Sequence, residues 1–127
     1  MKQIGIFGKR KSGKSALMYA LTKHKMTQET KFSSMEISGA EKSAESMEVA
    51  IMLMSNDYFD LEMAWLSKLR KIGVKIILVI SQADKFSDGG KSLAAAVNEI
   101  SGLKTFCVSA KTGLGIEELY KEISQSL

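Results

Sequence analysis

Short runs of consecutive apolar residues alternate along the chain with stretches in which apolar residues recur every three or four positions. The short runs predict buried strands, and the spaced stretches predict amphipathic helices. Four strands are predicted: Gln3–Gly8, Glu48–Met54, Val74–Ile80 and Lys104–Val108. Four helices are predicted: Lys14–Lys25, Asp57–Ile72, Lys91–Ile100 and Ile116–Leu127. The weaker pattern over Lys31–Ile37 leaves a fifth strand open.

The alternation of strands and helices favours a parallel sheet with right-handed crossovers, because each helix returns the chain to the same end of the sheet. We therefore expect an α/β fold of three layers with a mostly parallel sheet. A chain of 127 residues fits one domain, which is predicted to span 1–127.

Composition narrows the class and setting of the protein. The chain is 45% hydrophobic and 25% charged, which is typical of an ordinary globular protein and excludes wholesale disorder. No apolar run approaches the roughly 20 residues that a membrane helix needs. The single cysteine forms no internal disulfide. A cytoplasmic protein with no membrane span is therefore expected.

Residues 8–15, GKRKSGKS, match the phosphate-binding pattern G-x-x-x-x-G-K-[ST] at every fixed position. The match lies between a predicted strand and a predicted helix, where backbone N–H groups and the helix N-terminus can face an anion. Gly13 lets the backbone approach a phosphate. Lys14 would supply positive charge to the β and γ phosphates and is the candidate catalytic residue, and Ser15 offers a hydroxyl to Mg²⁺. The predicted nucleotide-binding residues of this segment are Gly8, Lys11, Ser12, Gly13, Lys14, Ser15 and Ala16.

Three consecutive basic residues, Lys9, Arg10 and Lys11, occupy variable positions of this motif. We interpret them as residues that raise the local positive potential rather than as a nucleic-acid site. The net charge of +4 permits an anionic ligand, and no DNA partner is expected from it.

Two further polar segments follow predicted strands. Ser81-Gln82-Ala83-Asp84-Lys85 comes after one strand, and Ser109-Ala110-Lys111 comes after the next. Ligands bind open α/β sheets outside the carboxyl ends of the strands, so both segments are expected to face the phosphate-binding loop.

With the loop, Asp84 and the segment Ser109-Ala110-Lys111 in this order, the chain resembles P-loop GTPases of the translation-factor class. The resemblance implies a guanine nucleotide, GTP or GDP, with Mg²⁺. It implies that the Asp84 carboxylate pairs with the N1 and N2 donors of guanine. It also implies that the Ala110 N–H faces O6 and that Lys111 lies near the base. The nucleotide-binding residues added on this basis are Gln82, Asp84, Ser109, Ala110 and Lys111.

Within that class, the segments IGIFGKRKSGKSALMYALT and KIGVKIILVISQADK are similar to the GTPase domain of iron-only hydrogenase maturation GTPases.

Two features of the sequence depart from the class. First, Ser81 and Gln82 stand where the family has Asn, which braces the loop, and Lys, whose stem covers the base. We therefore expect a weaker guanine preference, by about 1–3 kcal/mol for one or two lost hydrogen bonds.

Second, no Asp-x-x-Gly segment precedes the second predicted strand, although the family uses it to hold Mg²⁺ and to sense the γ-phosphate. The predicted fold is therefore shortened by one or two strands after the first helix. Thr30 is the candidate Mg²⁺ ligand beside Ser15, with Thr27 as the alternative. Asp57 and Asp60 would serve either as substitute acids or, more simply, as helix-stabilising residues. Weak or partner-dependent GTP hydrolysis is expected.

The shortened sheet would leave Gln3–Gly8 at or near an edge unless Lys31–Ile37 fills the vacancy. An exposed apolar edge predicts a homodimer or a protein partner. The alternative to a GTP-binding protein is therefore an interaction module that keeps the fold, binds nucleotide weakly and recruits a partner through the exposed edge. A P-loop kinase of small substrates is a third possibility, disfavoured by Asp84 and by the absence of an Arg-rich segment.

Overall fold

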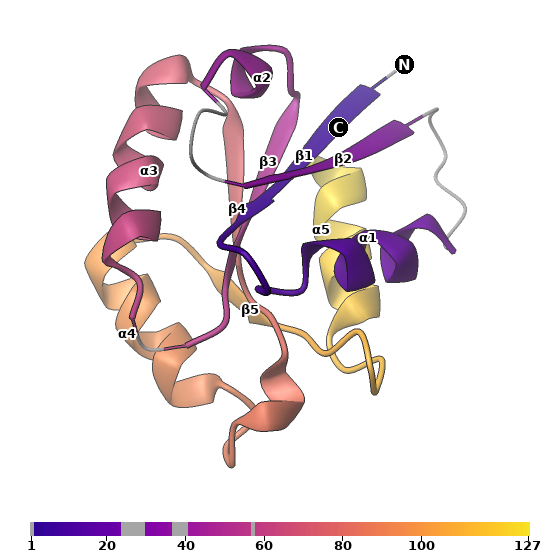
Figure 1. The fold of residues 1–127 in the computed structure, drawn as a ribbon, viewed down its shortest axis with the longest axis vertical. Helices are drawn as coiled ribbons and strands as arrows, with labels where there is room; N and C mark the ends of the chain where they lie inside the picture. The colour runs from indigo at the N-terminus through magenta and orange to yellow at the C-terminus, as the bar shows by residue number, and fades with distance from the viewer. Residues whose placement is uncertain (1, 24–29, 37–40, 57) are drawn as a thin grey trace.

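A five-stranded parallel sheet forms the centre of the protein, in the strand order β2-β1-β3-β4-β5 (Figure 1). The computed structural model describes residues 2–23, 30–36, 41–56 and 58–127. The strands are β1 Lys2–Gly8, β2 Thr30–Glu36, β3 Val49–Met54, β4 Lys75–Ile80 and β5 Thr105–Cys107. The helices are α1 Lys14–Thr22, α2 Glu41–Glu45, α3 Asp60–Ile72, α4 Lys91–Ser101 and α5 Ile116–Ser126, with a short 3₁₀ turn, η1, at Ala83–Lys85.

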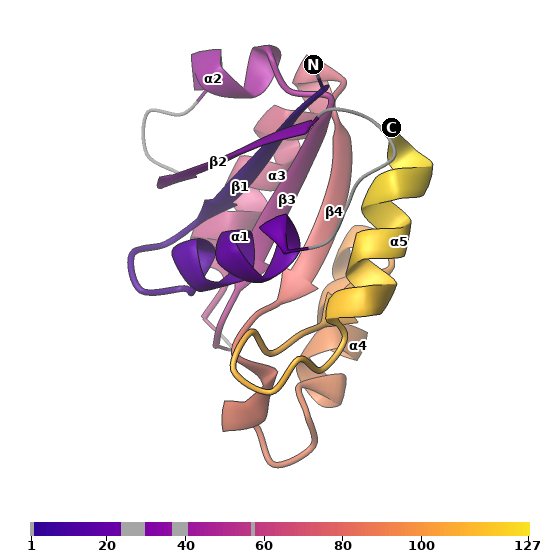
Figure 2. The ribbon, with the colours of Figure 1, turned by 90° about the vertical axis from the view of Figure 1, so that its right-hand side faces the viewer.

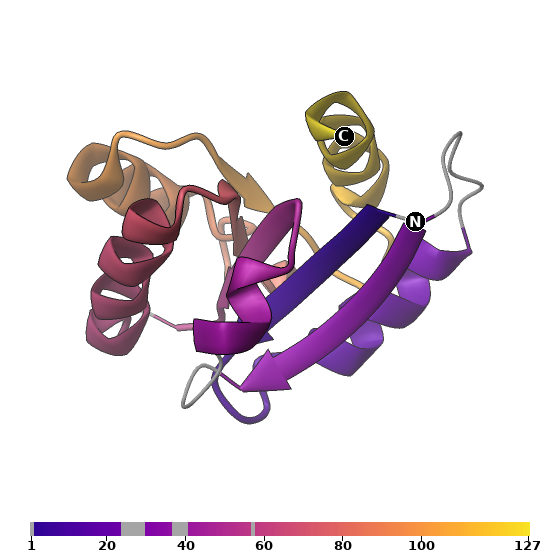
Figure 3. The same cartoon turned by 90° about the horizontal axis from the view of Figure 1, so that it is seen from above.

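Helices cover both faces of this sheet, so the three-layer prediction is confirmed. Helices α1 and α5 lie on one face, and α3 and α4 lie on the other (Figure 2). Seen from above, the same two pairs flank the twisted sheet, and α2 lies beside its upper end (Figure 3). Among the described helices, none is long and apolar enough to cross a membrane.

The most apolar predicted strands occupy the middle of the sheet. All six residues of β3 are buried, because its side chains face a helical layer on each side. The cluster beneath α3 includes Phe7, whose ring lies 5.9 Å from that of Trp65. Helix α3 ends at Gly73, which adopts the left-handed conformation with φ of 86° and donates its N–H to the carbonyl of Leu69.

Strand β2 resolves the alternative left open for the sheet edge. It pairs in parallel with β1 along its whole length, from Lys2 opposite Thr30 to Gly8 opposite Glu36. Strand β1 therefore lies between β2 and β3, which is the alternative in which a strand within Lys31–Ile37 fills the vacancy. The region between α1 and β3 holds this one strand among the residues that the structure describes, in keeping with a shortened fold.

The same register corrects the assignment of Thr30 as a Mg²⁺ ligand. Thr30 begins β2 at the end of the sheet opposite to Gly8. Six residues of strand separate the two ends, which is roughly 20 Å. Thr30 and Ser15 therefore cannot share one ion in this arrangement, since both side chains are short. The alternative, Thr27, lies outside the described residues, as does Asp57.

Candidate nucleotide-binding site

The loop between β1 and α1 has the backbone geometry that its glycines allow. A Cβ at Gly8 would lie 2.4 Å from Ser12 Oγ, so a larger residue would have to displace the buried Ser12 side chain where the strand turns into the loop. Gly13 precedes α1 with φ of 95°, a left-handed backbone conformation that residues other than glycine rarely adopt. These two constraints curl residues 8–13 ahead of the N-terminus of α1, the arrangement that suits an anion.

The ammonium group of Lys14 closes this loop from within. It donates hydrogen bonds to the carbonyl oxygens of Gly8, at 3.0 Å, and of Lys9, at 2.7 Å. The backbone N–H of Ser12 also donates to the Lys9 carbonyl, at 3.1 Å. Lys14 therefore lies in the loop, where a bound phosphate would compete with these neutral acceptors for its charge.

Two side chains from the segment after β4 brace the loop. The buried Ser81 hydroxyl donates to the carbonyl of Ser12 at 2.5 Å, and the Gln82 amide donates to the carbonyl of Lys11 at 3.2 Å. Lys11 and Gln82 both have positive φ, 65° and 56°, which the bracing helps to hold. Ser81 thus makes the bracing contact that the resemblance assigns to Asn. Its loss would leave a carbonyl unpaired, at a cost of about 1–3 kcal/mol.

A pocket opens beside the loop at the carboxyl ends of β4 and β5. Six of the predicted nucleotide-binding residues line this pocket together, and four further residues complete its wall. The predicted ones are Gly13, Ala16, Gln82, Asp84, Ala110 and Lys111, and the others are Leu17, Ser81, Lys85 and Val108. The fold therefore brings the phosphate-binding loop and the segment after β4, which lie nearly seventy residues apart in the sequence, to one pocket.

Asp84 presents an ionised carboxylate in this pocket. The Ser109 hydroxyl donates to Asp84 Oδ1 at 2.7 Å, and Ser109 Oγ in turn accepts the N–H of Thr112 at 3.1 Å. The Ser109 hydrogen bond lowers the pKa of Asp84 below its ordinary value, and the positive charges of Lys111 and Lys85 lower it further. Asp84 itself is exposed, so its carboxylate can accept hydrogen bonds from a ligand. Ser109 therefore orients the side chain and keeps it charged.

Two of the residues considered as Mg²⁺ ligands, Ser15 and Asp60, are exposed. Ser15 lies exposed in the first turn of α1, and Asp60 lies exposed at the start of α3, where its charge faces the helix N-terminus. No group of three His, Cys, Asp or Glu side chains suited to a metal occurs among the described residues.

The backbone of Glu36 lies next to the start of the phosphate-binding loop. Glu36 is the last residue of β2, and the strand register places its backbone directly opposite Gly8, where the phosphate-binding loop begins. Glu36 and Gly39 have the acid-x-x-Gly spacing, with Glu in place of Asp.

Comparison with known proteins places this architecture in a class. No family model and no curated protein matches the chain. Solved structures do. The protein is similar to a probable GTP-binding protein, engB, with a TM-score of 0.73 and 19% identity over 98% of this chain and 97% of that one. It is similar to the FeoB G-domain from Methanococcus jannaschii, with a TM-score of 0.66 and 22% identity over 99% and 98%.

A third similar structure is translation elongation factor SelB from Methanococcus maripaludis, in complex with the GTP analogue GppNHp. Its TM-score is 0.79 at 19% identity, over 98% of this chain but 33% of SelB. At sequence identities of 19–22%, these similarities establish the fold alone. The protein has the α/β fold of P-loop GTPases, with a five-stranded, wholly parallel sheet.

Proposed function

We propose that the protein binds a guanine nucleotide, with the phosphates in the loop of residues 8–15 and the base in the pocket beside it. The observation that carries the proposal is the position of Asp84. Its carboxylate is ionised, is oriented by Ser109, and lines the same pocket as Gly13 and Ala16 at the end of the phosphate-binding loop. Two carboxylate oxygens match the two adjacent N–H donors of guanine, whereas the corresponding edge of adenine has no such pair.

Mg²⁺ is proposed as the accompanying ion. Ser15, in the first turn of α1, would bind it through its hydroxyl. Hydroxyl and carboxylate oxygens are ligands that Mg²⁺ prefers. The bound ion would neutralise charge on the β and γ phosphates.

Equilibrium titration with GDP, GTP and ADP, each with and without Mg²⁺, tests the proposed function. We expect GDP and GTP to bind at least tenfold more tightly than ADP, because only guanine offers both donors to Asp84. Mg²⁺ should strengthen GTP binding. Equal affinity for ADP would contradict the base assignment, and no binding of any nucleotide would favour the alternative of an interaction module.

GTP hydrolysis is proposed to be weak or dependent on a partner. Phosphoryl transfer needs a positioned ion and an oriented water, and the chain has no Asp-x-x-Gly segment before β3. In single-turnover assays of the isolated protein we expect a rate below about 10⁻² per second, near that of an unassisted GTPase. A rate of several per second, typical of an activated GTPase, would contradict this.

Other assignments stay predictions at this stage. They are the relation to iron-only hydrogenase maturation GTPases, the cytoplasmic location and the single domain over 1–127. The homodimer or protein partner predicted for a sheet edge is now proposed for β2, since β2 and not β1 forms that edge. A strictly monomeric profile in sedimentation at high concentration would count against self-association.

A further inference from the structure

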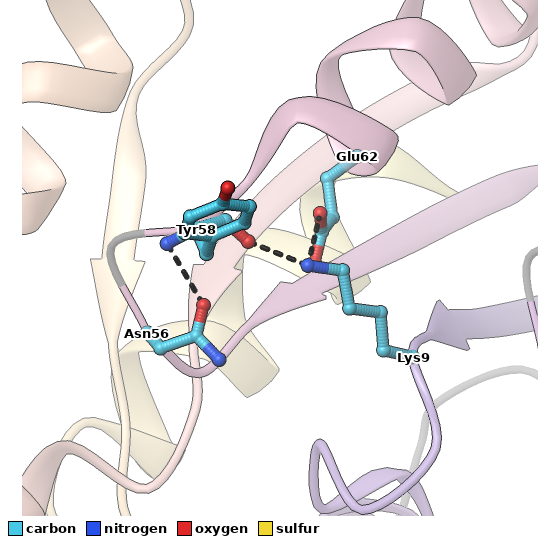
Figure 4. Close-up of polar contacts among 4 residues, drawn as sticks. All are labelled: Lys9, Asn56, Tyr58 and Glu62. Carbon is cyan, nitrogen blue, oxygen red and sulfur yellow. Dashed lines mark hydrogen bonds and ion pairs between the residues drawn. The ribbon is translucent and has the colours of Figure 1, made fainter.

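An ion pair ties the first residue after Gly8 to helix α3. The ammonium of Lys9 lies 3.2 Å from Glu62 Oε1 and donates a hydrogen bond to the Tyr58 carbonyl at 2.5 Å (Figure 4). The loop after β3 is shaped to present that carbonyl, since the Tyr58 N–H donates to Asn56 Oδ1 at 2.8 Å. The Lys9 side chain therefore extends from the phosphate-binding loop to the first turn of α3.

The burial of Glu62 makes this pair unlike an ordinary surface ion pair. Its side chain is only 3% exposed, and Oε1 accepts no hydrogen bond within the described part of the chain. A buried carboxylate is stable only when a neighbouring charge compensates it, so Glu62 depends on Lys9. By contrast, the pair of Lys121 and Glu117 is 3.7 Å long and more than two-thirds exposed on both sides, where an ion pair has little effect.

Lys9 also lies at the centre of the loop's own hydrogen bonds. Its carbonyl accepts from both the Lys14 ammonium and the Ser12 N–H. The side chain of Lys9 is therefore held by α3, while its backbone carbonyl binds Lys14, the lysine assigned to the phosphates. Because Glu62 and the Tyr58 carbonyl hold the Lys9 side chain, the first turn of the loop is ordered before an anion binds.

We propose that Glu62 is a positioning residue for the phosphate-binding loop, acting through Lys9. This rests on the proposed binding of guanine nucleotide to that loop. Glu62 keeps residues 8–12 in the conformation that receives a diphosphate, so that less conformational freedom is lost on binding. Sequence reasoning interpreted Lys9 as a variable loop position, and the structure gives it this specific contact.

The sign of one substitution separates positioning from simple electrostatics. Glu62→Gln keeps the shape of the side chain but removes a negative charge near the phosphate site. Through-space attraction alone would then make GDP bind more tightly. Loss of positioning would make it bind about three- to tenfold more weakly, the effect of leaving one loop residue to be ordered on binding. We expect the weaker binding.

A double-mutant cycle, read by GDP titration and by thermal unfolding, completes the test. Lys9→Met should weaken GDP binding to a similar extent, and Glu62→Gln added to it should weaken binding no further. Lys9→Arg, which keeps the charge, should restore most of the affinity. The matched control, Lys121→Met, breaks the exposed pair and should bind as the wild type does. Thermal unfolding of each variant shows whether stability and affinity change separately, as positioning requires.

Each outcome decides between the two proposals. If the wild type and Lys121→Met bind GDP while Glu62→Gln binds equally or more tightly, the positioning role is overturned and nucleotide binding stands. If the effects of Lys9→Met and Glu62→Gln add fully, the two residues do not act through each other and the proposal is likewise overturned. If the wild type does not bind GDP, the proposed function itself fails, and the inference fails with it.

Discussion

Replacing Lys14 with alanine is expected to reduce the affinity for GDP by at least a hundredfold. The ammonium lies inside the loop, where it bonds the carbonyls of Gly8 and Lys9. Its removal takes away a charge-assisted contact to the phosphates and leaves those carbonyls without the ammonium donor. Titration with a fluorescent GDP measures the effect.

The control for this substitution is Lys121→Ala. It removes the same charge from the exposed surface of α5, so net charge changes equally in the two variants. If both variants bound GDP as the wild type does, or lost affinity equally, the loop would not be the phosphate site.

The second large effect concerns the base. Asp84→Asn replaces two acceptor oxygens by one acceptor and one donor. The amide then faces the N1 and N2 donors of guanine with one mismatch, and we expect at least a hundredfold loss of GDP affinity. Xanthine carries an oxygen in place of the 2-amino group, so the amide of the variant matches it. Xanthosine diphosphate should therefore bind the variant better than GDP does.

Asp88→Asn serves as the matched control for Asp84. Asp88 lies in the same connection between β4 and α4, but its carboxylate accepts the N–H groups of Gly90 and Ser92 at the start of the helix. Its substitution should affect stability and leave the choice of base unchanged. Unaltered preference for GDP over xanthosine diphosphate in Asp84→Asn would show that Asp84 does not recognise the base.

Local pattern sufficed for most of the fold. The apolar runs of β3 and β4 predicted buried strands because a strand covered on both faces must be apolar throughout. The phosphate-binding loop was recognisable because its backbone conformation demands glycine at fixed positions. Helix α2 was missed, since five residues are too few to show a helical period.

Contacts between distant segments could not be predicted in the same way. The polar sequence of β2 carries no sign of which strand it pairs with, and the position of β1 and the error over Thr30 both follow from that pairing. With Ser81 in place of Asn, the contact that braces the loop was expected to be lost. The Ser81 hydroxyl nevertheless donates to the carbonyl of Ser12, 69 positions earlier in the chain. The pairing of Lys9 with Glu62 depends likewise on where α3 packs.

We propose that backbone amides of residues 8–15 hold a diphosphate while Asp84 binds the attached guanine. The amide resonances of the ¹⁵N-labelled protein, followed during titration with GDP, report on both contacts at once. We expect saturable shifts at the N–H groups of residues 9–15, together with shifts at Asp84 and Ala110, and none of these in Lys14→Ala at the same GDP concentration. Saturable shifts confined to another part of the surface, or no shifts at all, would contradict it.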